Sequence, residues 1–298
     1  TEIKWGFIMI DFGLLMFSTD YAISPDVLAK EAEAHGFESL FLPEHTHIPA
    51  SRKSPWPGGD ELPQEYWHTY DPFVALSMAA AVTENLKLGT GISLITERDP
   101  ILMAKQVASL DYLSKGRVVL GIGAGWNAEE MENHGTPFVH RWKILRERML
   151  AMREIWTEEE AEYHGDFVDF EKIWAYPKPV QAGGPPILLG ASSKYVYKRI
   201  AEYGDGWFPI YQNDKRKGAN GPVDYAEGIG LTRDAWQEAG RSGEPQFSIF
   251  GVGSDVEAVE SLLEMGFDRI IFALPSAEPD VVLPMLENYA AIAHKFNV

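Results

Sequence analysis

The sequence contains no cysteine among its 298 residues. A disulfide framework, a zinc site held by thiolates and a cysteine nucleophile are therefore excluded. No apolar run approaches the ~18 residues that a membrane-spanning helix needs. The first residues, TEIKWGFIMI, also lack the basic start and the cleavage site of a signal peptide. These features predict a soluble, cytoplasmic protein.

Basic residues are scarce as well. The chain has 44 acidic residues against 26 basic ones, which gives a formal net charge of -18. Such a charge repels phosphate backbones and anionic lipid headgroups, so neither nucleic acid nor a membrane is an expected partner. No Gly/Ser-rich linker or change of composition divides the sequence, and we expect residues 1–298 to form one domain.

Short apolar runs alternate with amphipathic stretches along the whole chain, and the runs are rich in β-branched and aromatic residues, as buried parallel strands are. Eight such runs occur, at 4–10, 38–43, 86–95, 117–125, 185–191, 206–210, 247–253 and 268–274. Eight strands in strict alternation with eight helices predict a closed (β/α)8 TIM barrel. Insertion loops are expected after strands 2 and 4, at 45–70 and 162–184, the second with a small hairpin.

Local signals predict several helix boundaries. Ser254 and Glu257 have the spacing of a capping box. A helix is expected from about 193 to 203, with Gly204 as its C-cap. The helical region that follows strand 4 is expected to break at Gly135 to Pro137.

Polar residues follow strand 2 in the stretch FLPEHTHIP, where Glu44, His45 and His47 are predicted to project into the mouth of the barrel. A metal would need further ligands from other strands, but strands 5 to 8 end in GAS, PIY, GVG and ALPS, so no metal is expected. An imidazole beside a carboxylate at a strand end is suited to proton transfer near neutral pH. Glu44 and His45 are therefore the predicted catalytic pair. The alternative is that both histidines only bond nearby backbone, a reading that fits His47 better.

The run GIGAGW at 121–126 is similar to a dinucleotide-binding fingerprint. The third glycine is replaced by Trp126, and no acidic ribose partner follows at a convincing distance of about 20 residues, so the fingerprint fails. Glycines here instead allow the strand end to approach a flat ligand or its neighbouring strands. Trp126 is predicted either to form an aromatic wall of the site or to pack under the loop.

Small residues between strand 5 and its helix, Gly190, Ala191 and Ser192, expose backbone N–H groups where a phosphate can bind. Simple N-capping by Ser192 or Ser193 is the alternative. The motifs of serine-triad hydrolases, P-loop enzymes and zinc proteases are absent from the sequence. The remaining features favour a planar cofactor that carries phosphate.

The sequence resembles the luciferase-like monooxygenase superfamily of (β/α)8 barrels and, within it, the oxidoreductases that depend on the deazaflavin coenzyme F420. The resemblance covers roughly residues 3 to 210. It is carried by FLPEHTHIPASR (41–52), YDPFVAL (70–76), the long block 86–131, PKPVQ (177–181), and PPILLG with DGWFP (185–190, 205–209).

The resemblance implies that Glu44 and His45 lie beside the deazaflavin ring, with His45 as the proton donor or acceptor. It implies a non-prolyl cis peptide bond between Gly91 and Ile92, in a bulge behind the ring. Some relatives have a glutamate acid where this chain has Trp126, so no second acid is expected at that position.

The resemblance also implies that the cofactor phosphate binds backbone around Gly190, Ala191 and Ser192, and that the barrel forms a homodimer through the helices near 71–83 and 100–114. Arg52, Lys53 and Arg98 are the basic candidates for the acidic tail of F420, and each is otherwise a solvated loop charge. The expected activity is hydride transfer between F420 and a small organic substrate. The alternatives are an FMN-dependent monooxygenase and a flavin-binding barrel without turnover.

Overall fold

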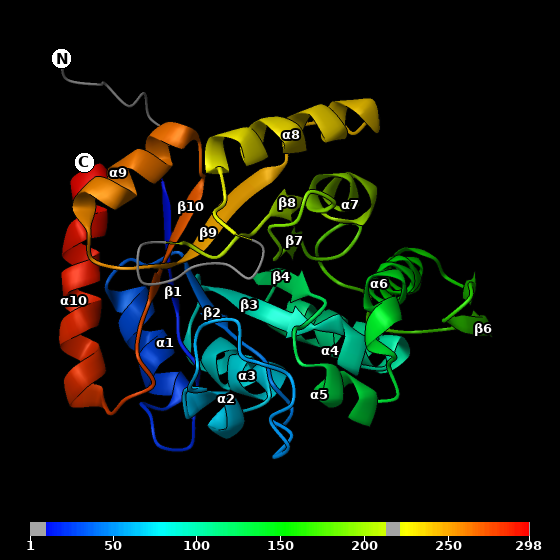
Figure 1. The fold of residues 1–298 in the computed structure, drawn as a ribbon, viewed down its shortest axis with the longest axis horizontal. Helices are drawn as coiled ribbons and strands as arrows, with labels where there is room; N and C mark the ends of the chain where they lie inside the picture. The colour runs from blue at the N-terminus through cyan, green and yellow to red at the C-terminus, as the bar shows by residue number, and fades with distance from the viewer. Residues whose placement is uncertain (1–9, 213–220, 298) are drawn as a thin grey trace.

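The computed structural model describes residues 10–212 and 221–297. Eight parallel strands close into a barrel in the order β1-β10-β9-β8-β7-β4-β3-β2, with helices around the outside (Figure 1). The predicted (β/α)8 barrel is confirmed. The barrel strands are β1 (Asp11–Leu15), β2 (Ser39–Leu42), β3 (Lys87–Leu94), β4 (Val118–Gly123), β7 (Ile187–Leu189), β8 (Gly206–Trp207), β9 (Gln246–Val252) and β10 (Arg269–Ala273).

Each barrel strand is followed by a helix that covers the outer face of the sheet. These helices are α1 (Pro25–Ala34), α3 (Pro72–Val82), α4 (Pro100–Leu113), α6 (Arg141–Thr157), α7 (Val196–Tyr203), α8 (Tyr225–Glu238), α9 (Val256–Met265) and α10 (Pro279–Phe296). The loops carry shorter elements, namely α2 (Glu65–His68), η1 (Ile95–Glu97), α5 (Ala128–Asn133), η2 (Phe138–His140) and the antiparallel hairpin of β5 (Ala161–His164) and β6 (Asp169–Ile173). The predicted hairpin and the predicted break after strand 4 are both confirmed. In the part of the chain that the structure describes, no helix combines the length and the apolar character needed to cross a membrane.

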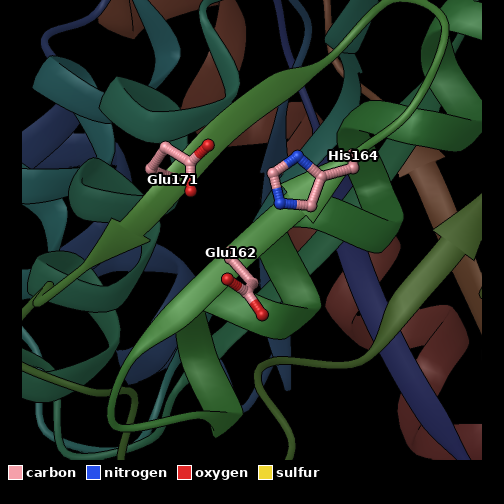
Figure 2. A group of neighbouring side chains, drawn as sticks. All are labelled: Glu162, His164 and Glu171. Atoms are coloured by element: carbon pink, nitrogen blue, oxygen red, sulfur yellow. The ribbon is translucent and has the colours of Figure 1, made fainter.

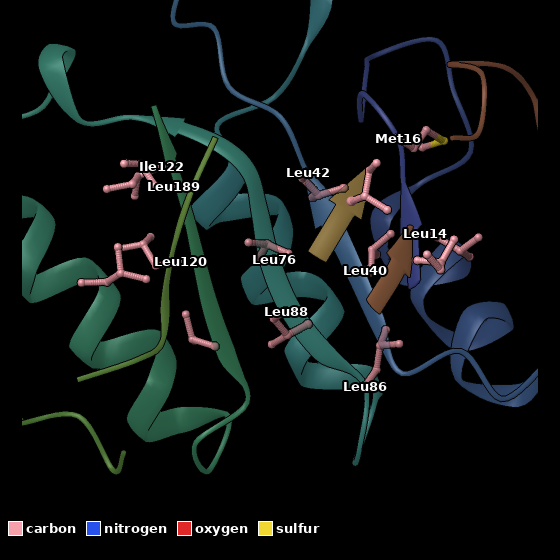
Figure 3. Packing of buried hydrophobic residues seen from close by; sticks show 14 of the residues in the cluster. Leu14, Met16, Leu40, Leu42, Leu76, Leu86, Leu88, Leu120, Ile122 and Leu189 are labelled. Atoms are coloured by element: carbon pink, nitrogen blue, oxygen red, sulfur yellow. The ribbon is translucent and has the colours of Figure 1, made fainter. Parts of the chain in front are cut away.

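Side chains of the barrel strands alternate between two apolar clusters. Leu40, Leu42 and Leu88 pack outward against Leu76 of α3 (Figure 3). The residues between them face the inside of the barrel, where the central cluster consists of Leu15, Phe41, Ile92, Val119, Leu188, Phe208, Phe250 and Ile271. Because both faces of each strand are buried, the strands read as continuous apolar runs in the sequence.

A network of charged residues lies where the strands begin. Arg269 donates from Nε and Nη2 to the carboxylate of Glu38, each bond at 2.9 Å, and from Nη1 to the Ser248 hydroxyl at 3.0 Å. Asp11 lies 3.3 Å from Nη2. The Arg269 side chain is 6% exposed, so this network holds a buried cation at the N-terminal end of the barrel.

The position of the first strand corrects the sequence-based expectation. Residues 4–9 of the expected strand lie outside the described residues, Ile10 is not in a strand, and β1 is the following stretch DFGLL. Asp11 and Gly13 are residue types that are uncommon in strands, and their contacts explain why they occur in β1. Asp11 belongs to the Arg269 network, and a side chain at Gly13 would lie 2.4 Å from Ser39 Oγ of the neighbouring strand.

Two predicted helix starts are also corrected. Asp255, and not Ser254, is the N-cap of α9, and its carboxylate accepts hydrogen bonds from the N–H groups of Glu257 and Ala258. Helix α7 begins at Val196, later than expected, although Gly204 follows it as predicted. In both places several polar residues stand in a row, and any of them satisfies the sequence pattern for a cap.

The Arg269 network predicts a pH-dependent contribution to stability. Burial is the largest single influence and acts to raise the pKa of Glu38, but the charges and hydrogen bonds of Arg269 and Lys87 together lower the pKa to about 2. Removing one partner of a buried pair costs roughly 3 kcal/mol, so we expect Glu38→Gln to lose about that much at about pH 7. Because the folded pKa lies below the unfolded one, the difference from wild type should shrink as the pH falls from about 4.5 toward 2.

Urea unfolding of both proteins across this pH range measures the difference. Glu260→Gln, an exposed change on α9, is the matched control and should leave the unfolding free energy unchanged. A wild-type advantage that stays constant down to the lowest pH would contradict the ion-pair explanation.

Candidate active site

Three neighbouring strands bring the candidate site together. β2, β3 and β4 lie side by side in the barrel, and their carboxyl ends open at the same end of it. His45 follows β2, η1 follows β3, and α5 follows β4. Side chains separated by as many as 88 residues in the chain therefore meet at this mouth.

His45 is held by a carboxylate from α5. Its Nδ1 lies 2.8 Å from Glu130 Oε2, and the N–H of Thr46 donates to Glu130 Oε1 at 3.2 Å. The side chains of His45 and Glu130 are 6% and 0% exposed. A buried carboxylate that accepts the Nδ1 proton fixes the tautomer and the orientation of the ring. Nε2 is thus the ring nitrogen that does not face Glu130.

Glu44 has a different set of contacts from the one expected. Its carboxylate accepts hydrogen bonds from the Ser93 hydroxyl at 2.5 Å, from the N–H of Leu94 at 2.8 Å and from Arg98 Nε at 2.6 Å. The expected Glu44–His45 couple is therefore corrected, because Glu130 holds the histidine. Glu44 instead joins the end of β2 to the end of β3.

Arg98, one of the three basic candidates for an acidic ligand tail, is occupied by internal contacts. Besides Glu44, its guanidinium donates to Asp71 Oδ2 at 2.6 Å and to Gln106 Oε1 at 3.2 Å. The role expected for Arg98 is thus corrected to a structural one. Arg52 and Lys53 are exposed in the loop after β2, and their role stays a prediction.

Aromatic rings enclose the imidazole. Tyr66 lies with its ring centroid 5.1 Å from that of His45, and Trp126 lies 5.9 Å away in an edge arrangement. Trp56 packs against Tyr66 at 5.6 Å. Of the two readings of Trp126, the geometry favours the aromatic wall, because its ring contacts both His45 and the insertion loop.

The insertion loop after β2 is bound to α5 through hydrogen bonds to Glu129. The carboxylate of Glu129 accepts hydrogen bonds from the N–H groups of Lys53 at 2.9 Å and Ser54 at 3.1 Å, and from the hydroxyls of Ser51 and Ser54. The Ser54 hydroxyl in particular lowers the pKa of Glu129 to about 2. α5 therefore carries two acidic residues in succession, one that holds the loop and one that holds His45.

The peptide bond between Gly91 and Ile92 is cis, as the resemblance implied, and the pairing of β3 with β4 shifts register around it. The side chain of Ile92 packs across the ends of two neighbouring strands. A side chain at Gly123 would lie 2.0 Å from Ile92 Cδ1, and one at Gly190 would lie 2.7 Å from Ile92 Cγ2. Glycines at 123 and 190 thus provide the space that Ile92 fills.

The loop after β7 offers fewer donors than expected. The N–H of Gly190 already donates to the Ile122 carbonyl at 2.8 Å, and the Ala191 carbonyl accepts from Trp207 Nε1 at 2.8 Å. Ser192 does not cap α7, whose N-cap is Tyr195 without a side-chain capping bond. The N-capping alternative for the serines is wrong, and the binding of a phosphate by this loop stays a prediction.

His47 behaves as a loop residue. Its Nδ1 lies 2.9 Å from Thr46 Oγ1 and its Nε2 lies 2.8 Å from Asn133 Nδ2. Both ring nitrogens therefore bond neighbouring side chains, and not the backbone that the alternative for this residue named.

The model of the family described as luciferase-like monooxygenase matches residues 27–271. The chain belongs to this family. Its members are flavin-dependent or F420-dependent oxidoreductases or monooxygenases. An uncharacterized protein of Mycobacterium tuberculosis is 40% identical to the luciferase-like chain over 283 residues, which cover 94% of this chain and 97% of the relative. The 5,10-methylenetetrahydromethanopterin reductase of Methanopyrus kandleri is 24% identical over 294 residues, which cover 92% of this chain and 74% of the relative.

Solved structures share the fold. A monooxygenase from Streptomyces bottropensis superposes with a TM-score of 0.78 at 17% identity, over 97% of this chain and 100% of that one. An F420-dependent secondary alcohol dehydrogenase in complex with an F420-acetone adduct gives 0.73 at 16% identity, over 95% and 98%. The oxygenating constituent of 3,6-diketocamphane monooxygenase from Pseudomonas putida, in complex with FMN, gives 0.74 at 16% identity, over 96% and 99%.

Sequence reasoning missed two acidic residues of this luciferase-like site, Glu130 and its neighbour Glu97. Both are buried, although acidic residues are almost never buried unless they are paired. The sequence signal that could have identified them is their position after a strand. Glu97 follows β3, and Glu130 lies in the first helix after β4. In the closed barrel, β3 lies beside β2, and β4 follows beside β3.

One group of potential metal ligands occurs among the described residues, and it is far from this site in the sequence and on a different element. Glu162, His164 and Glu171 lie on one face of the β5–β6 hairpin with ligand atoms within 4.8 Å of one another (Figure 2). All three are exposed, and His164 Nδ1 bonds Asp169 at 2.7 Å. The two-residue alternation of the hairpin places these polar side chains together on its solvent face, so their proximity needs no metal to explain it.

The glycines of β4 lead to a test of this packing. A side chain at Gly121 would lie 2.1 Å from the backbone oxygen of Thr90, whereas one at Gly123 meets the terminal methyl group of Ile92, which can rotate. Overpacking costs about 1–3 kcal/mol and occasionally more. We therefore expect Gly121→Ala to lose roughly 3 kcal/mol or more, and Gly123→Ala to lose roughly 1 kcal/mol, in urea unfolding. Equal losses in the two variants would contradict the packing described for β3 and β4.

Proposed function

We propose that the chain is an F420-dependent oxidoreductase that transfers a hydride between the deazaflavin and a small organic substrate, with His45 as the proton donor or acceptor. The observation that carries the proposal is the fixed imidazole at the mouth of the barrel. Glu130 holds Nδ1, the rings of Tyr66 and Trp126 lie beside the imidazole, and the side chain of His45 is buried.

The residues at the mouth fit a flat cofactor with an anionic tail. Ile92 and Trp126 offer apolar and aromatic surface at the ends of β3 and β4, and the cis bond between Gly91 and Ile92 shapes the backbone behind that surface. Ser192, together with Ala191 and the uncapped start of α7, would hold a phosphate, because helix N-termini bind anions.

The protein itself supplies orientation and the proton. Bound F420 supplies the hydride chemistry. Glu130 keeps His45 in the tautomer that carries its proton on Nδ1, so Nε2 can accept a proton from an alcohol or, once protonated, return one to a carbonyl oxygen. Glu44 contributes indirectly, because it joins the ends of β2 and β3 beneath the reacting groups.

Relatives of both cofactor classes bear on the choice. The methanopterin reductase relative matches 92% of this chain, and the secondary alcohol dehydrogenase with an F420 adduct shares the fold. The alternative, an FMN-dependent monooxygenase, is supported by the monooxygenase from S. bottropensis and by the FMN complex of the diketocamphane enzyme. A flavin-binding barrel without turnover is not supported, because the members of the family are enzymes.

Cofactor choice is tested by titrating the purified protein with F420 and with FMN while tryptophan emission is followed. We expect F420 to quench the emission at micromolar concentration, and Trp126→Phe to reduce the quenching because this ring lies at the proposed site. Micromolar binding of FMN without a response to F420 would overturn the proposal in favour of the monooxygenase.

Replacement of His45 tests the proton-transfer role. We expect His45→Ala to lower turnover about 100-fold or more, in line with the usual contribution of a general acid or base, and to leave F420 affinity within about two-fold. Oxidation of reduced F420 by a panel of small aldehydes, ketones and enones measures turnover. His47→Ala, the same change two residues on, is the matched control and should retain activity. Full activity of His45→Ala would remove the histidine from the mechanism.

We further propose that the chain is a single domain that forms a homodimer through α3 and α4. Both helices expose large apolar side chains on the face that does not pack against the barrel. Val74 and Met78 of α3 are 65% and 46% exposed, and Leu102 of α4 is 58% exposed. Large exposed apolar patches mark interaction sites, and a twofold pair of identical patches is the commonest arrangement. The absence of nucleic-acid and membrane partners, and the cytoplasmic location, stay predictions from the sequence.

Charge introduced on this surface tests the dimer. The double change Val74→Glu and Leu102→Glu is expected to convert a dimer into a monomer in light scattering after size-exclusion chromatography. Leu231→Glu on α8, a helix on another side of the barrel (Figure 1), is the control and should leave the mass unchanged. A wild-type protein that elutes as a monomer would refute the dimer.

A further inference from the structure

Glu97, at the end of η1, is a buried acid for which the proposed mechanism has no use. Its side chain is 1% exposed. Neither carboxyl oxygen has a hydrogen-bond donor among the described residues. An unpaired buried carboxylate is costly, so the group must either be neutral or bond something that carries a proton.

Two nearby arginines direct their hydrogen bonds to other groups. Arg98, the next residue in the chain, donates to Glu44, Asp71 and Gln106. Arg148 of α6 donates to the Ile95 carbonyl at 2.9 Å and to the Thr136 hydroxyl at 3.4 Å.

His134, which follows α5, also leaves Glu97 uncompensated. Its Nε2 lies 3.9 Å from Glu97 Oε2, beyond hydrogen-bonding distance, and lies 2.7 Å from the hydroxyl of Thr46. Burial and the neighbouring His47 lower the pKa of His134, so it is neutral at neutral pH. No cation in the described part of the chain therefore pairs with Glu97.

The group that does contact Glu97 is the other buried acid, Glu130, which lies within hydrogen-bonding reach of it. Glu130 is already an acceptor twice, from His45 Nδ1 and from the N–H of Thr46. Two ionised carboxylates cannot bond each other, and their repulsion is strong in a buried site. The contact becomes a hydrogen bond when Glu97 carries a proton and donates it to Glu130.

We propose that Glu97 is a positioning residue for His45, which stays protonated at neutral pH and donates its O–H to Glu130, so that His45, Glu130 and Glu97 form one buried triad. This arrangement leaves a single negative charge behind the imidazole. It also gives Glu130 a third donor, which fixes its carboxylate in the plane that accepts the Nδ1 proton of His45.

The electrostatics agree with this arrangement. Burial, followed by the charges of Glu130 and Glu44, raises the pKa of Glu97 to about 9. The acid form is therefore the dominant one across the neutral range. Above about pH 9 the triad would lose its proton and gain a second charge beside Glu130.

The first experiment examines the proton directly and needs no cofactor. Infrared difference spectra of the whole protein at about pH 7 compare wild type with Glu97→Gln, whose amide also donates a hydrogen bond to Glu130. We expect a protonated carboxyl band in the wild type that is missing in Glu97→Gln. Glu132→Gln, an exposed change on α5, is the matched control and should retain the band. Absence of the band in the wild type would overturn the proposal.

Stability gives a second readout on the same protein without cofactor. Because the folded pKa of Glu97 lies above its unfolded value, the acid favours the folded state fully below about pH 4.5, and this advantage is lost as the pH rises toward about 9. The Tm of Glu97→Gln minus that of wild type should therefore increase between about pH 5 and pH 9. A difference independent of pH would contradict a proton on Glu97.

A third experiment measures turnover. It rests on the proposed function, whereas the infrared and stability experiments do not. We expect Glu97→Ala to lower turnover by about 10-fold or more, as loss of an outer positioning group does. Glu97→Gln should restore it, and should also abolish the wild-type decline in turnover near pH 9. If the band and the Tm trend are present but no variant turns over F420, the proposed function has failed and the proton on Glu97 stands. Equal turnover of the Ala and Gln variants would refute the positioning role.

Discussion

The hydrogen bond between His45 and Glu130 is the contact on which the site depends. It joins the end of β2 to the helix after β4, across the strand that separates them in the barrel. The parallel arrangement of β2, β3 and β4 brings these two loops to the same place, because all carboxyl ends open at one end. The strongly apolar strands thus create the fixed geometry in which one imidazole becomes useful for chemistry.

The fold was largely predictable because its signal is local. Each strand reads as an apolar run with both faces buried, and eight such runs in alternation with helices leave few other architectures. The exception was β1, where Asp11 and Gly13 weaken the pattern. Both residues are explained only by their partners on neighbouring strands, Arg269 and Ser39. Because these partners are distant in the sequence, a local sequence pattern cannot reveal them.

The site was predictable in part. His45 stood out because it directly follows a strand, and the cis bond at Gly91 was implied by the family resemblance. The acid that holds His45 was misassigned to the adjacent Glu44, because closeness in sequence is a poor guide where the chain turns at a strand end. Glu130 lies 85 residues away, and only the order of strands in the barrel brings it into contact.

The succession of Glu129 and Glu130 on α5 has a kinetic consequence. Glu129 binds the loop after β2 and Glu130 orients the imidazole of His45, so one six-residue helix holds both in place. With the proposed function, a displacement of that helix would alter KM and kcat together. Changes in the loop that alter substrate preference would then have to leave Glu130 in place.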